Sequence, residues 1–124
     1  MAQLPPAIAT PALLYQGQPG TGEATIYTAP AYASGSPYTS GSTTIVKRVV
    51  ICNTSAATAT LTLYRVPSGG SAGVTNMVLN AFSVAATDTQ ILDLEQEMNP
   101  GDFLAALQSV AGALTVTISG ATFQ

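Results

Sequence analysis

The chain has 124 residues, enough for one domain with a small core, and it carries a net charge of −3. Charged residues make up only 7% of it, against roughly 25% in typical soluble domains. Three basic residues are too few to neutralise a nucleic-acid backbone, so no nucleic-acid partner is expected. No apolar run is long enough to span a membrane, so no membrane association is expected either.

Side chains suited to catalysis are scarce. Histidine is absent and Cys52 is the single cysteine, which excludes an internal disulfide, a zinc site and a histidine-activated nucleophile within one chain. Cys52 follows a β-like apolar run and is predicted to be a small buried residue. We therefore expect no enzymatic activity, no cofactor and no small-molecule substrate.

Four of the six acids fall between Asp88 and Glu97. Asp93, Glu95 and Glu97 alternate onto one strand face and could supply an oxygen-rich calcium site, but their spacing matches no defined calcium loop. A solvated strand edge is the favoured interpretation, and no metal is expected. Two carboxylate pairs also remain possible candidates for general acid–base catalysis: Asp93 with Asp102, and Asp88 with Glu95.

In chain order, residues 1–22 come first and are predicted to form an extended arm. They hold four prolines and three glycines, and proline favours an extended form without internal hydrogen bonds. Leu13, Leu14 and Tyr15 would anchor this arm on its own domain or on a neighbour; a frayed terminus is the alternative. The start has no positively charged region typical of a signal peptide, so we expect assembly in a cytoplasm.

Residues 23–124 are predicted to form a single β domain. Residues 23–28 form its first strand, and a polar loop follows. Within this loop Tyr32 and Tyr38 could be contact residues, because tyrosine supplies a large amphipathic area at low entropic cost. The alternative is that they pack back over the edge of their own domain.

The next two predicted strands are residues 44–52 and 57–66. The first has apolar residues on both faces, Ile45, Val49 and Ile51 on one and Val46, Val50 and Cys52 on the other, which predicts a central strand covered on both sides. Residues 53–58 are predicted to be a hairpin link in which Asn53 bonds neighbouring backbone. Asn53 also begins a glycosylation acceptor pattern, which we interpret as accidental because no secretory signal accompanies it.

Four further strands are predicted at 76–85, 89–94, 103–110 and 113–119. Residues 95–98 are expected to form a short turn, and Gly120 is expected to bend the chain. Residues 103–110 favour a helix by propensity, but their place between two turns favours a strand. Seven or eight short strands separated by Gly, Pro and Asn turns indicate an all-β fold, an antiparallel β-sandwich or jelly roll.

The polar surface of such a domain must consist mainly of hydroxyl, amide and backbone groups. These groups lose far less than ions do when they leave water. We therefore expect much of this surface to be buried against neighbouring subunits, because weakly charged surfaces tend to associate. A monomer with an unusually neutral surface is the alternative.

Two runs carry a family resemblance: VKRVVICNTSAATATLTLYRVPSGGSAG at 46–73 and NPGDFLAALQSVAGALTVTISG at 99–120. Over about residues 27–120 the chain resembles small phage and prophage virion structural proteins. The shared features are a Cys-Asn-Thr turn after a strand, a Val-Pro-Ser-Gly-Gly turn and a late Gly-Asp. The arm and the tyrosine loop lie outside this pattern.

The resemblance implies a virion protein assembled in a bacterial cytoplasm. Such proteins decorate, or cement, capsids, and this is the leading hypothesis; its partners would be the major capsid protein or other virion proteins, and a homotrimer is favoured. A tail, baseplate or fibre component is the alternative. A carbohydrate-binding module or small glycosidase is a remote third, because it would need an aromatic-lined groove and the chain has no tryptophan.

Overall fold

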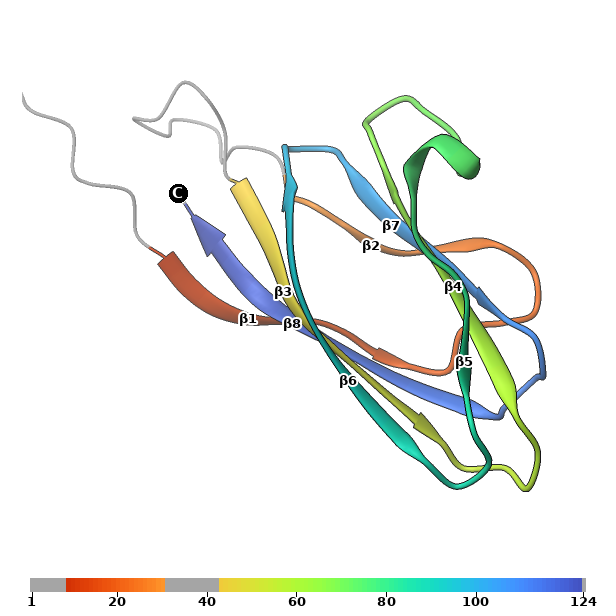
Figure 1. The fold of residues 1–124 in the computed structure, drawn as a ribbon. Coiled ribbons are helices and arrows are strands. Elements are labelled where there is room, and N and C mark those ends of the chain that lie inside the picture. Colours follow the sequence, from red (N-terminus) through yellow and green to blue (C-terminus); the bar gives the residue numbers. More distant parts are fainter. Residues whose placement is uncertain (1–8, 31–42, 124) are drawn as a thin grey trace, which may run out of the picture.

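The computed structural model describes residues 9–30 and 43–123. They form a sandwich of two four-stranded antiparallel sheets (Figure 1). In spatial order, the first sheet contains β1 (Ala9–Gly17), β8 (Leu114–Phe123), β3 (Thr43–Asn53) and β6 (Thr89–Met98), and the second contains β2 (Ala24–Thr28), β7 (Phe103–Gln108), β4 (Ala59–Val66) and β5 (Met77–Val84).

This order defines an eight-stranded jelly roll, because successive strands change sheet at every connection except the one between β4 and β5. A three-residue 3₁₀ turn, η1 (Val74–Asn76), precedes β5. The predicted all-β sandwich is therefore confirmed. Within the described ranges, no helix is long and apolar enough to cross a membrane.

The core lies between the two sheets and is built from alternating positions of their strands. Residues predicted to face inward, such as Leu61 and Leu63 in β4 and Val116 and Ile118 in β8, are almost fully buried. Burial of such a side chain stabilises the fold by roughly 1.5–3 kcal/mol. Period-two alternation of apolar and small polar residues thus produces both the strands and the core.

Strand β7 shows tertiary pairing overriding local propensity. Its sequence FLAALQ contains good helix formers, yet it lies between β2 and β4 and pairs with both. Leu104 and Ala106 enter the core, and Gln108 is also fully buried. The Gln108 amide accepts a hydrogen bond from the Leu114 backbone N–H and donates to the Pro19 carbonyl, which joins the β7–β8 and β1–β2 connections.

The faces of β3 differ from the predicted ones because the strand contains a bulge. Its pairing with both β6 and β8 shifts register between Val46 and Arg48. Val46 therefore joins Val49 and Ile51 in the core, and Ile45 turns outward.

Two predictions for β3 are corrected as a result. Among the described residues the strand is covered on its inner side, whereas Ile45, Val50 and Cys52 on its outer side are half-buried. Cys52 is thus not a core residue, because its position in the alternation points it away from the second sheet.

The 53–58 link is not a hairpin, since β3 and β4 belong to different sheets. Asn53 does organise it, as predicted: the side chain is buried and its Nδ2 donates to the carbonyls of Ala57 (2.8 Å) and Val84 (3.0 Å). Its Oδ1 accepts from the backbone N–H of Ser55 at 2.9 Å. In the folded chain this amide is therefore enclosed and fully hydrogen-bonded.

Both late strands are longer than predicted. Residues 95–98 continue β6 rather than turning, because Glu97 and Met98 still pair with Ile45 and Thr44 of β3. Likewise β8 runs through Gly120 to Phe123 without a break. Gly120 allows the backbones of β8 and β3 to approach each other closely, since a Cβ at this position would overlap the carbonyl oxygen of Ile45.

The predicted arm of residues 1–22 includes a strand of the sandwich. Residues 9–17 pair with β8 as an edge strand of the first sheet and are therefore part of the domain. Leu14 enters the core, and Ala12 and Tyr15 pack against it. Residues 1–8 lie outside the described residues.

Candidate functional site

The structure separates the residues predicted to make contacts with partners. Leu13 points outward from β1 and is 61% exposed, whereas Leu14 is buried in the core. A register shift between Leu13 and Tyr15 turns Leu14 inward. Tyr15 packs partly against the core, and this burial raises the pKa of its phenol above the ordinary value of 10.0. Tyr32 and Tyr38 lie outside the described residues.

Leu13 belongs to a broad surface, which we call the outer face: the outward side chains of β1, β8, β3 and β6. Strand register arranges these side chains in rows that cross the sheet. The rows are Pro11–Ala121–Ile45–Glu97, Leu13–Ser119–Arg48–Asp93, Gln16–Thr117–Val50–Ile91 and Thr115–Cys52–Thr89.

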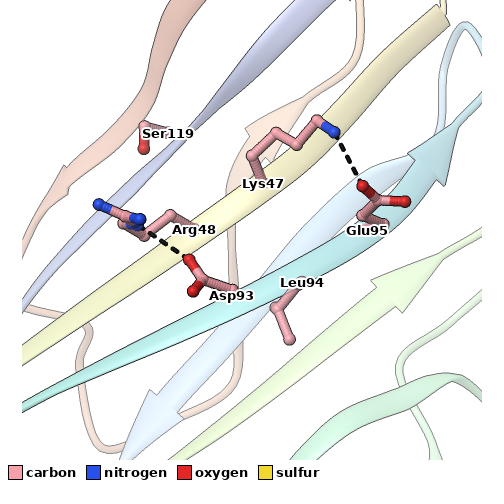
Figure 2. Close-up of a pocket in the computed structure, with 6 residues that line it drawn as sticks. All are labelled: Lys47, Arg48, Asp93, Leu94, Glu95 and Ser119. Carbon is pink, nitrogen blue, oxygen red and sulfur yellow. Dashed lines mark hydrogen bonds and ion pairs between the residues drawn. The ribbon is translucent and has the colours of Figure 1, made fainter.

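The β3 bulge creates a hollow of about 520 Å³ on this face (Figure 2). Its rim holds two ion pairs between β3 and β6: Lys47 Nζ lies 2.9 Å from Glu95 Oε1, and Arg48 Nε lies 3.0 Å from Asp93 Oδ1. All four side chains are about half exposed or more. Exposed pairs of this kind contribute roughly 0–1 kcal/mol each, so they neutralise charge more than they stabilise the fold.

The acids predicted as possible pairs have separate partners. Asp93 is engaged by Arg48 on the outer face, and Asp88 accepts from Gln90 Nε2 at 2.8 Å. Asp102 is buried in the β6–β7 turn, where its two oxygens accept from the backbone N–H groups of Ser68 and Asn99 at 2.9 Å each. Among the described residues no group of three or more His, Cys, Asp or Glu side chains could hold a metal ion.

A second hollow, of about 470 Å³, lies beside η1. Arg65 lines it, with its Nε donating to the Glu97 carbonyl at 2.6 Å and its Nη2 lying 3.7 Å from Asp102 Oδ2. Neither this hollow nor the one on the outer face has an aromatic ring in its lining. A sugar-binding groove would stack its ligand on such rings, so the geometry of these two hollows does not favour the carbohydrate hypothesis.

The sequence pointed to Leu13 but missed Ile91, which is 58% exposed on the opposite edge of the same face. Residues 89–94 alternate as a strand should, but alternation does not show which strand lies at an edge. Likewise, Val50 was predicted to be covered, because it lies in an apolar run in which the bulge at Lys47 cannot be recognised from the sequence. The outer face therefore became visible only once register and strand order were known.

Comparison with family models gives no match, and comparison with curated proteins gives none. Among solved structures, the chain is similar to a chain of infectious bursal disease virus, Gx strain, with 16% identity and a TM-score of 0.49 over 94% of this chain. For the Gt strain of that virus the identity is 13% and the TM-score 0.44, over 93% of this chain. In both cases it spans 31% of the viral chain's length.

Proposed function

We propose that this protein is a non-enzymatic structural component of a phage virion, and that it decorates the capsid by binding between capsid subunits. The observation that carries the proposal is the distribution of charge. Five of the eight described strands, β1, β2, β5, β7 and β8, hold no charged residue. The three basic side chains are all paired with acids of the same chain.

A surface of this kind is suited to burial against another protein. Hydroxyl and amide groups cost far less to desolvate than unpaired ions. Apolar area contributes roughly 25 cal/mol per Å² when it leaves water, before the costs of ordering. An oligomer of this chain that engages several sites of a repeating shell at once would multiply such modest contributions through avidity.

The virion assignment is supported by the sequence resemblance to small phage and prophage structural proteins, which extends over about residues 27–120 and so takes in β3 to β7 and most of β8. The jelly roll is compatible with it, since double-sheet jelly rolls occur among viral capsid domains. Fold alone does not define a role, so the resemblance and the neutral surface support the proposal together.

The test compares particles with and without this chain. Particles that lack it should lose thermal or mechanical stability, and adding back the purified protein should restore it. A reconstruction of the complete particle should show density for the sandwich on the head shell. Unchanged shell stability would contradict the decoration role, and density at the tail or baseplate would favour the tail-component alternative.

A further inference from the structure

The hollow beside η1 is built from both sheets of the sandwich. Gln96 lines it from β6, an edge strand of the first sheet, and Met77 and Val78 line it from β5, an edge strand of the second. Arg65 reaches it from β4. Its volume of about 470 Å³ lies within the range of small-molecule sites, roughly 300–1,000 Å³.

Arg65 is held in one orientation within this hollow. Its Nε donates to the Glu97 carbonyl at 2.6 Å, and its Nη2 lies 3.7 Å from Oδ2 of Asp102, which two backbone N–H groups fix in place. The distance of 3.7 Å is too long for a hydrogen bond. A guanidinium has five N–H donors, so most of those of Arg65 have no acceptor among the residues that the structure describes.

Two further polar groups of the lining are free to bind a ligand. The Gln96 amide and the Thr75 hydroxyl make no hydrogen bond within the described part of the chain. The Asn76 amide, by contrast, is fully engaged: its Oδ1 accepts from the Gly73 N–H at 3.0 Å and its Nδ2 donates to the Ser71 carbonyl at 2.9 Å. Asn76 therefore fixes the rim, and the donors of Arg65, Gln96 and Thr75 surround the hollow.

We propose that this hollow binds a short aliphatic monocarboxylate. The planar fork of a guanidinium matches the two oxygens of a carboxylate, and the Gln96 amide and Thr75 hydroxyl supply further donors. The rest of the lining includes the apolar side chains of Pro67, Met77 and Val78, which an alkyl chain would contact. The hollow thus combines an apolar wall with a few polar groups that orient the ligand.

The charges around the hollow select a singly charged ligand. Arg65 is the one basic residue of the lining, and the Asp102 carboxylate lies 3.7 Å behind its Nη2. A phosphate or a dicarboxylate would place a second negative charge near Asp102 without a second cation to offset it. A carboxylate with an uncharged tail avoids this repulsion.

The carboxylate can belong to a free acid or to a glutamate side chain of another protein, because both present the same group on a short alkyl chain. Its binding does not depend on the proposed virion role, since the purified chain holds every residue of the hollow. A negative result here would therefore leave the decoration role untouched.

NMR of the full-length protein tests the proposal, because the chain contains only two arginines, Arg48 and Arg65. Titration with sodium butyrate at constant ionic strength should shift the Nε–H signal of Arg65 to saturation, with a dissociation constant of about 1–10 mM for so small a ligand. The Arg48 signal should show no saturation, since that side chain is engaged by Asp93 on the outer face. Acetate should bind more weakly because it lacks the alkyl chain, and uncharged butyramide should give no saturable shift. N-acetylglutamate amide distinguishes the sources: tighter binding than butyrate indicates a protein side chain, and weaker binding a free acid.

Two matched variants locate the site. Arg65→Lys keeps the positive charge but loses the planar fork, and should raise the butyrate dissociation constant at least fivefold, measured on the backbone amides of residues 75–78. Arg48→Lys makes the same change on the outer face and should leave the constant unchanged. Thermal unfolding establishes that both variants are folded, and the comparison of butyrate with butyramide on the wild type needs neither.

Four results would overturn the proposal. The first is a parallel, unsaturated shift of both arginine signals, which would mean an adventitious ion only. The others are the absence of any Arg65 shift, equal binding of butyramide, and a butyrate affinity that Arg65→Lys leaves unchanged.

Discussion

At the scale of single residues, Asn53 shows how one polar side chain can define a connection between sheets. Its amide group bonds the carbonyls of Ala57 and Val84 and the backbone of Ser55, all in a site where the side chain is almost inaccessible. No apolar residue could replace these bonds. The buried amide therefore determines the path from β3 to β4 more than the surrounding Ser, Thr and Ala residues do.

Asn53→Ala should lower the free energy of unfolding by about 2–3 kcal/mol, because it leaves buried carbonyl groups without donors. Urea denaturation followed by circular dichroism measures this change. Asn80→Ala is the matched control, since Asn80 is exposed on β5 and should change stability by no more than about 0.5 kcal/mol. Equal effects of the two substitutions would show that the Asn53 bonds do not stabilise the connection.

Tyr15 makes stability depend on alkaline pH. Burial raises the pKa of its phenol above 10.0, so the folded state favours the neutral form. Below pH 10 this contribution is fully present; as the pH rises toward the folded-state pKa, the unfolded state ionises first and stability falls. Denaturation measured from pH 8 upward should show this fall in the wild type, and a shallower one in Tyr15→Phe. Identical pH profiles would contradict it.

At the scale of strands, Gly120 marks the closest approach in the first sheet. A methyl group there would overlap the carbonyl oxygen of Ile45 on β3, next to the bulge. Gly120→Ala should therefore lower the free energy of unfolding by about 3 kcal/mol or more, as measured by thermal or urea denaturation. Gly22→Ala is the control, because a Cβ at Gly22 meets no atom within 4 Å. A neutral Gly120→Ala would mean that β3 and β8 can separate at low cost.

The four edge strands each carry a feature that hinders pairing with another strand. Strand β1 has Pro11 and a bulge, β2 is five residues long, β5 is distorted at Ala81 with a φ of 48°, and β6 carries acids on its outward side. Natural sheets use such devices against edge-to-edge aggregation. Association of this chain is consequently expected through a sheet face and not through a strand edge.

Strand existence was readable from the sequence where alternation is clear, as at Leu114, Val116 and Ile118, because one face had to be buried. The bulge at Lys47 could not be predicted from the sequence, because the apolar residues around it occupy both odd-numbered and even-numbered positions of the strand. Nor could local turn chemistry at 53–58 reveal that the chain changes sheet, which depends on the whole strand order. Leu13 could be proposed as a contact residue from the sequence. The exposure of Ile91 could not, because it depends on β6 lying at the edge of its sheet.

At the scale of the whole molecule, nine charged residues include three acid–base pairs, and the remaining acids, Glu23, Asp88 and Glu97, lie apart on connections or the outward side of β6. No extended field of one sign is left to steer the protein to a partner. If the protein binds particles as proposed, this binding must depend mainly on apolar burial and neutral hydrogen bonds.

Association with particles should accordingly be insensitive to salt. Ionic strength screens exposed charges over about 8 Å at 0.15 M and about 3 Å at 1 M, but it leaves apolar contacts largely intact. Binding of the purified protein to particles that lack it should change by no more than about threefold between 0.05 M and 1 M sodium chloride, a difference below 1 kcal/mol. Leu13→Glu should weaken that binding and make it salt-dependent if the outer face contacts the shell, whereas Val110→Glu, at a connection between β7 and β8, should not. A tenfold loss of wild-type affinity at high salt would show that ion pairs, and not the neutral faces, hold the protein in place.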